Sequence, residues 1–123
     1  MALIMIAEDT PEIAQLVKII LQARGHQVVT VSDGLQMVEK AKDWKPHLII
    51  ADIMMPGTYG TAAYKALQAD PATAAIPVAF LTAVPLEQAR KLVAEAPGVR
   101  LLKKPVEIPV LMKADEDLLY PKI

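Results

Sequence analysis

One short stretch limits the possible folds of this chain more than any other. Residues Leu48 to Ala51 form a continuous apolar run that leads directly to Asp52. Such a run, bounded here by Pro46 and Pro56, is typical of a strand that is buried on both faces. Strands of this kind occur in parallel sheets covered by helices. Because ligands of open α/β sheets bind at the carboxyl ends of the strands, Asp52 is the first candidate functional residue.

The rest of the chain alternates between strand and helix patterns. Further short apolar runs predict strands at residues 3–7, 27–31, 78–81 and 99–102. Amphipathic spacing predicts helices at about residues 11–24, 34–43, 61–69, 85–96 and 108–119. Thr10-Pro11 and Asp33 have the residue types that begin helices. Five strands that alternate with five helices predict an α/β fold with a parallel sheet between two helical layers.

Composition excludes several classes of protein. With 123 residues, 54% apolar and 22% charged, the chain predicts one globular domain spanning residues 1–123. The net charge of −1 and the absence of a dense Lys/Arg cluster argue against direct nucleic-acid binding. The chain has no cysteine, which excludes thiolate metal sites and disulfides. No apolar run reaches the roughly 20 residues that span a membrane, and the amino-terminal segment lacks a signal peptide's basic region, so we expect a cytoplasmic protein without membrane contact.

Polar side chains follow the carboxyl ends of the predicted strands and are expected to meet at one edge of the sheet. They are Glu8, Asp9, Asp52, Thr82 and Lys104. Three carboxylates in one place repel one another unless a cation neutralises them, and Mg²⁺ prefers such oxygen ligands. A lysine and a hydroxyl add a positive charge and a hydrogen-bond donor. Together these groups can handle a phosphoryl group, with a carboxylate as its acceptor.

Four motifs occur in the order and spacing of one protein family. They are the acidic pair Glu8-Asp9, the D-x-x-M-P-x-x-x-G pattern of residues 52–60, the pair Thr82-Ala83 and the pair Lys104-Pro105. From residue 3 to about residue 119, the chain resembles the CheY-like receiver domains of bacterial two-component response regulators. The resemblance implies a flavodoxin-like, doubly wound (βα)5 sandwich of three layers, with strand order 2-1-3-4-5.

The resemblance also implies roles for the motif residues. Asp52 would accept a phosphoryl group from a histidine kinase or phosphotransfer protein, and Thr82 and Lys104 would contact that group. The implied Mg²⁺ ligands are Asp9, Asp52, the backbone carbonyl of Met54 and, through water, Glu8. In this family the bond between the lysine and the following proline is often cis. Of the two adjacent lysines, spacing to Pro105 favours Lys104 over Lys103.

A domain of this kind is a signalling switch rather than an enzyme with a separate substrate. Its chemistry would be limited to Mg²⁺-dependent phosphorylation of itself and autodephosphorylation. Its downstream partner would be a target protein or a detached output domain, and a homodimer through the fourth helix, fifth strand and fifth helix is a further option. The sequence does not distinguish a stand-alone receiver from one domain of a longer protein.

One departure from the family keeps an alternative open. The family usually carries Tyr or Phe three residues before the lysine, where this chain has Leu101. The alternative is a degenerate receiver that acts as a phosphorylation-independent protein-interaction module. A haloacid-dehalogenase-type hydrolase is disfavoured because Met54 stands where that family has a second aspartate. His26 and His47 have no second ligand at metal spacing and are interpreted as structural residues.

Overall fold

The protein is described by a computed structural model that covers residues 2–53, 60–93 and 97–120. The strands are β1 (Leu3–Ala7), β2 (Gln27–Val31), β3 (Leu48–Asp52), β4 (Val78–Thr82) and β5 (Val99–Lys103). The helices are α1 (Pro11–Ala23), α2 (Gly34–Trp44), α3 (Gly60–Ala69), α4 (Leu86–Leu92) and α5 (Ile108–Leu119). The predicted alternation of strands and helices is therefore confirmed. Within the described ranges, no helix is long and apolar enough to cross a membrane.

The five strands form one parallel sheet in the order β2-β1-β3-β4-β5, as predicted. In the middle of the sheet, Met5 of β1 lies between Val29 of β2 and Ile49 of β3. The order reverses between β1 and β3, because the chain first adds β2 on one side and then β3 on the other. In folds of this type, the crevice at the carboxyl ends of these two strands is the place where ligands bind.

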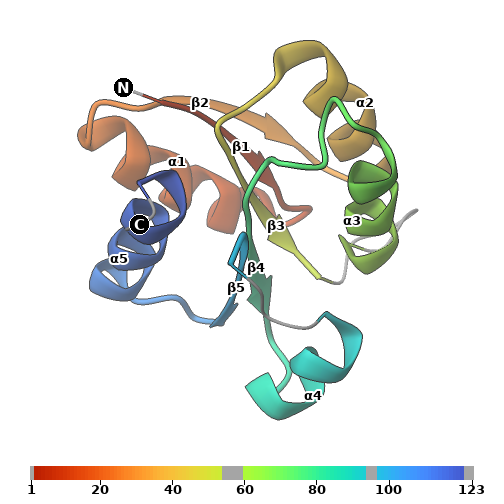
Figure 1. Cartoon of the computed structure of the whole chain (residues 1–123). Helices are drawn as coiled ribbons and strands as arrows, with labels where there is room; N and C mark the ends of the chain where they lie inside the picture. The colour runs from red at the N-terminus through yellow and green to blue at the C-terminus, as the bar shows by residue number, and fades with distance from the viewer. Residues whose placement is uncertain (1, 54–59, 94–96, 121–123) are drawn as a thin grey trace.

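Helices cover both faces of the sheet (Figure 1). On one face, α1 and α5 pack Val17 and Leu111 against Ile4 and Ile6 of β1. On the other face, α2, α3 and α4 contribute to a second core that contains Met5. Because side chains alternate between the two faces of a strand, β1 supplies both cores. The continuous apolar runs in the sequence reflect this burial on both sides.

The central strands are buried most completely. Every residue of β3 and of β4 is buried, whereas the edge strand β2 has only Val31 in that class. Phe80 of β4 is fully buried and meets Tyr64 of α3 edge-on, with ring centroids 5.5 Å apart. Aromatic pairs of this geometry add to the stabilisation that burial alone gives. The central strands are therefore a rigid support for the residues at their ends.

The helix boundaries agree with the sequence signals at some ends and not at others. The Asp33 carboxylate accepts a hydrogen bond from the backbone N–H of Gln36 at 2.8 Å, which confirms the predicted cap of α2. Gly25 has a φ of +88° just after α1, the left-handed conformation for which glycine is suited. The Thr10 side chain makes no capping hydrogen bond within the described chain, although Pro11 begins α1 as predicted. Thr10 thus stands at the predicted N-cap position of α1 but contributes its backbone and not its side chain.

The fourth helix is shorter than predicted. It was expected to continue to residue 96, but α4 ends at Leu92, and Val93 is extended, with φ −139° and ψ 117°. Residues 94–96 lie outside the described residues. The extended backbone buries the β-branched Val93 in the core, whereas Leu92 is 52% exposed. The contact with the sheet at Val93 therefore overrides the helical periodicity.

Candidate functional site

The candidate site lies at the carboxyl edge of the sheet. Glu8 and Asp9 follow β1, and Asp52 is the last residue of β3. Thr82 is the last residue of β4, and Lys104 directly follows β5. Because all five strands are parallel, their carboxyl ends meet at this one edge. The acidic residues of β1 and β3 stand at the point where the strand order reverses.

The three carboxylates converge. One oxygen from each of Glu8, Asp9 and Asp52 lies within 4.8 Å of the others. Glu8 and Asp52 are 3% and 6% exposed, whereas Asp9 is exposed to solvent. Three hard oxygen donors at this separation, one of them open to water, suit a Mg²⁺ ion, which binds few carboxylates and keeps several waters. The donor set therefore fits the metal that the sequence predicts.

Lys104 supplies positive charge to the same place. Its Nζ lies 2.8 Å from Asp52 Oδ2, to which it donates a hydrogen bond, and 2.8 Å from Glu8 Oε1. Glu8 Oε1 is buried and accepts no hydrogen bond of good geometry from the described residues, so the attraction of Lys104 to it is Coulombic. One lysine faces three carboxylates, which leaves an excess of negative charge for a cation to neutralise.

The conformation of the strand β5 end agrees with the sequence motif. The peptide bond between Lys104 and Pro105 is cis, as the resemblance implied. Lys104, rather than its neighbour Lys103, reaches the carboxylates, because Lys103 is exposed at the end of β5. The backbone N–H of Lys104 also donates to the Thr82 carbonyl at 2.7 Å, which ties the lysine to the end of β4.

Burial and charge shift the pKa of two of these groups. Desolvation raises the pKa of Glu8, and the nearby Asp52 charge adds to this, although Lys104 and the backbone N–H of Thr10 oppose it. Desolvation would lower the pKa of Lys104, but its hydrogen bond with Asp52 and its attraction to the Asp52 and Glu8 carboxylates outweigh desolvation and raise that pKa. Lys104 therefore stays fully charged in the site.

Thr82 is buried and its hydroxyl bonds within its own loop. Oγ1 accepts a hydrogen bond from the backbone N–H of Val84 at 3.1 Å. In neighbouring β5, Leu101 is buried and pairs in register with Phe80 of β4. The large aromatic side chain in this part of the core thus belongs to β4 and not to β5. Leu101 has no ring that could rotate to follow a movement of Thr82.

The remaining sequence predictions have separate outcomes. Met54, whose carbonyl was expected to bind metal, lies outside the described residues. The Nδ1 atoms of His26 and His47 accept hydrogen bonds from the backbone N–H groups of Ala2 and Leu3, at 3.3 and 3.0 Å. Both imidazoles thus hold the start of β1 in place, in agreement with their interpretation as structural residues.

The sequence analysis missed one residue with unusual chemistry. Asp115 of α5 is 4% exposed, and neither of its oxygens has a hydrogen bond within the described chain. A signal for it existed, because Asp115 stands four residues after Leu111 and three before Leu118, on the buried stripe of the helix. It lies far along α5 from Lys104, at the amino-terminal edge of the sheet.

Comparison with known proteins gives consistent matches. Residues 4–115 match the family described as the response regulator receiver domain. Protein PilH of Pseudomonas aeruginosa is 35% identical over 114 residues, which cover 92% of this chain and 93% of PilH. The DNA-binding response regulator MtrA of Mycolicibacterium smegmatis is 30% identical over 80 residues, which cover 65% of this chain and 34% of MtrA. The matched segment thus spans about a third of that relative's length.

A solved structure shows the same arrangement of the whole chain. It is the crystal structure of the signal receiver domain of a signal transduction histidine kinase from Syntrophus aciditrophicus. Its TM-score is 0.86 at 33% sequence identity, and the alignment covers 97% of this chain and 90% of that one. The flavodoxin-like fold predicted from the sequence is therefore confirmed.

Proposed function

This chain belongs to the response regulator receiver domains, the signalling switches of two-component systems, and we propose that it works by accepting a phosphoryl group on Asp52. The observation that carries the proposal is the position of Asp52 at the end of β3. It lies beside two further carboxylates and 2.8 Å from Lys104 Nζ. We further propose that residues 1–123 form a single receiver domain.

The transfer would take place between a histidine and Asp52. An oxygen of Asp52 attacks the phosphorus of a phosphohistidine on a histidine kinase or phosphotransfer protein. The bond from phosphorus to the histidine nitrogen breaks, and that nitrogen keeps the electron pair. Lys104 would then offset negative charge on the phosphoryl oxygens, as cationic groups do in other phosphoryl transfers. The Thr82 hydroxyl would turn from Val84 to donate to one of these oxygens.

The carboxylates would hold Mg²⁺ for this reaction. Asp9 and Asp52 are proposed as direct ligands, Glu8 as a ligand through water, and the Met54 carbonyl as a further ligand. When bound, the ion supplies positive charge that screens the carboxylates from the incoming phosphoryl group. Glu8 is oriented for this role by the hydrogen bond that the Thr10 N–H donates to its Oε2 at 3.2 Å. The charge deficit left by Lys104 alone supports the need for such an ion.

Phosphorylation of Asp52 would change contacts with a downstream target protein or output domain. Exposed apolar side chains on α4 and α5 support this face as the contact surface, including one between two copies of the chain; they are Leu92, Ile108 and Val110. We propose no direct contact with nucleic acid or membrane for this domain, and we place the reaction in the cytoplasm. Turnover of a separate substrate is not part of the proposal, because the phosphoryl group is attached to the protein itself.

The test is the intact mass of the protein after incubation with acetyl phosphate or phosphoramidate and Mg²⁺. We expect a gain of one phosphoryl group, about 80 Da, that is absent in Asp52→Asn and is lost when Mg²⁺ is chelated. Asp117→Asn is the matched control, because Asp117 lies on α5 and pairs with Arg100 outside the site. If the protein binds no Mg²⁺ and gains no mass, the proposal is replaced by the alternative of a phosphorylation-independent interaction module. Leu101, in place of the usual Tyr or Phe, would then be explained as part of that loss of switching.

A further inference from the structure

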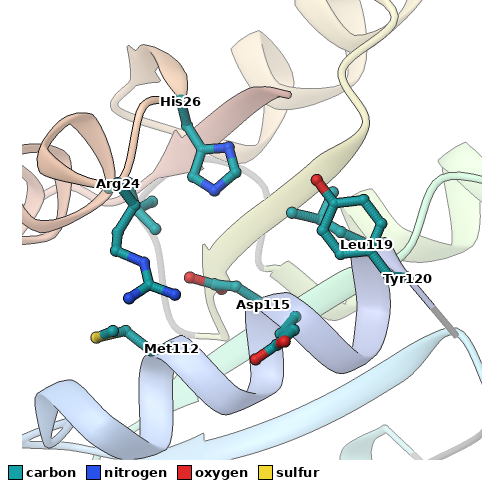
Figure 2. A pocket seen from close by; sticks show the side chains of 8 residues that line it. Arg24, His26, Met112, Asp115, Leu119 and Tyr120 are labelled. Atoms are coloured by element: carbon teal, nitrogen blue, oxygen red, sulfur yellow. The ribbon is translucent and has the colours of Figure 1, made fainter. Parts of the chain in front are cut away.

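A second polar pocket lies at the other end of the molecule from Asp52. It is formed by the end of α1, the residue before β2 and the last turns of α5 (Figure 2). Its volume is about 210 Å³, and it is lined by Leu21, Arg24, His26, Met112, Asp115, Glu116, Leu119 and Tyr120. Because His26 precedes β2, the pocket belongs to the amino-terminal edge of the sheet. The proposed phosphorylation chemistry uses none of these residues.

The base of the pocket is the carboxylate of Asp115. Figure 2 shows this side chain projecting from α5 toward the space between Arg24 and His26. It is 4% exposed, and neither oxygen accepts a hydrogen bond from any residue in the described part of the chain. Leaving a buried acceptor without a partner is costly, and more so when it carries a charge. In its ionised form, the Asp115 carboxylate therefore requires a donor that the described chain does not provide.

The rim of the pocket carries hydrogen-bond donors, in contrast to the acceptor at its base. Arg24 is exposed and, among the described residues, forms no ion pair, although its charge acts on Asp115 through space. His26 accepts a hydrogen bond at Nδ1, which leaves Nε2 as the protonated nitrogen of a neutral ring. Desolvation and nearby positive charges, among them Arg24, lower the pKa of His26 and keep the ring neutral. The rim thus offers hydrogen-bond donors.

We propose that this pocket binds a small zwitterion, of the class of free α-amino acids with a short apolar side chain. The ligand's ammonium would donate to Asp115, and its carboxylate would accept from Arg24 and from His26 Nε2. Its side chain would contact the apolar wall of Leu21, Met112 and Leu119. The proposal is independent of phosphorylation at Asp52.

Charge complementarity selects the zwitterion over simpler ions. A cation without an acidic group would satisfy Asp115 but would lie close to Arg24, which repels it. An anion without an amino group would be attracted to Arg24 but repelled by Asp115 and Glu116. Only a ligand with both charges matches the acceptor at the base and the donors at the rim. The volume, below the roughly 300 Å³ at which pockets for drug-sized ligands begin, limits that ligand to a small metabolite.

The ionisation of Asp115 supports the same assignment. Burial raises the pKa of Asp115 to about 7, and the Arg24 charge opposes this only in part. An ammonium held against the carboxylate would favour its ionised form. Binding of the zwitterion should therefore release a proton near neutral pH and become stronger as the pH rises through 7. The other titratable groups that face Asp115 are Arg24, His26, Glu116 and Tyr120.

The test is a titration of the 123-residue chain by two-dimensional amide NMR with three matched probes. L-Valine carries both charges, isobutylamine lacks the carboxylate and isovalerate lacks the ammonium. We expect saturable shift changes with valine, confined to the end of α1, the start of β2 and α5. Isobutylamine should bind at least about tenfold more weakly, and isovalerate should not bind at concentrations up to about 20 mM.

Variants identify the two halves of the site. Asp115→Asn should weaken valine binding by at least about tenfold, because it removes the charge that holds the ammonium. Arg24→Gln, a surface change that leaves the core intact, should reduce the preference for valine over isobutylamine to about twofold or less. Asp117→Asn, on the same helix but paired with Arg100, should bind valine like the unmodified protein.

Three results would overturn the proposal. The first is the absence of chemical-shift changes with valine up to about 20 mM, because the dissociation constant for valine would then lie well above that concentration. The second is isovalerate binding as well as valine, because the role of Asp115 would then be wrong. The third is an Arg24→Gln protein that keeps the full preference for valine, and this result remains decisive even if Asp115→Asn fails to fold.

Discussion

Two buried carboxylates lie at opposite ends of this molecule, and their surroundings differ. Asp52 is 6% exposed and receives a hydrogen bond from Lys104, whereas Asp115 is 4% exposed and receives none from the described chain. For Asp52, the positive charge of Lys104 offsets the cost of burying the carboxylate. In the second case, the compensation is protonation, since burial raises the pKa of Asp115 to about 7. The ion-paired residue is the one at the sheet's carboxyl edge, where we propose that phosphorylation occurs.

Asp115 should make folding less favourable as the pH rises. Its pKa is 3.8 as an ordinary aspartate and about 7 in the folded protein. Its contribution to stability is therefore complete below about pH 4 and is lost as the pH rises to about 7, because over this range the folded state holds a proton that the unfolded chain has already released. We expect the difference in unfolding free energy between the protein and Asp115→Asn to change by a few kcal/mol, roughly, across this range.

Urea unfolding at several pH values measures this difference. Other groups with shifted pKa values, such as Glu8, contribute equally to both proteins and cancel from it. A difference that stays constant from about pH 4 to pH 8 would contradict the raised pKa of Asp115.

At the scale of the element, two helix starts that look alike in sequence have different structures. Asp33 caps α2 through its side chain, whereas Thr10 offers α1 only its backbone carbonyl, which accepts from the N–H of Ala14 at 3.1 Å. Pro11 partly explains this, because it sets the backbone angle at the first turn and has no N–H to cap. The two positions therefore form a natural pair for a test.

We expect Asp33→Ala to lower the unfolding free energy by about 1 kcal/mol, because it removes the acceptor for the Gln36 N–H. Thr10→Ala should lower it by less than about half that amount, since no capping bond is lost. Chemical denaturation of both variants provides the comparison. Equal losses would mean that the Thr10 hydroxyl contributes to α1 in solution.

Most of the fold could be predicted because the strands are continuously apolar. Residues 48–51 have no other stable place than the middle of a covered sheet, and the carboxylates that follow the strands must then share an edge. The end of α4 could not be predicted, because Val93 leaves the helix for a tertiary contact that local periodicity does not encode. Asp115 was missed because a single carboxylate in an apolar stripe has no motif.

At the scale of the whole molecule, the sheet has an apolar core on each face and a polar site at each end. The α1–α5 core and the α2–α3–α4 core lie on opposite faces of the sheet, and the candidate metal site lies at its carboxyl edge. An ion at that site would bind only the folded protein. The three carboxylates lie at the ends of β1 and β3 and come together when the sheet is formed.

Mg²⁺ should therefore stabilise the protein against thermal unfolding. At a free concentration ten times its dissociation constant, the ion should add about 1.4 kcal/mol and raise the melting temperature by about 5 °C. Asp52→Asn and Asp9→Asn should lose most of this shift, because each removes a proposed ligand. Asp115→Asn, which changes the other end of the molecule, should keep it. A shift of equal size in all four proteins at matched ionic strength would place the ion elsewhere.

The complete burial of β3 has a consequence for the way the switch can move. Each of its residues is covered, and the strand is paired on both sides by β1 and β4. Amide hydrogens in such a strand exchange with solvent only when the whole domain opens. We therefore expect β3, which carries Asp52, to be among the slowest-exchanging segments of the described chain. If Asp52 is phosphorylated as proposed, we expect β3 to keep its place and the rearrangement to occur in the segments around it, with Asp52 as the fixed point.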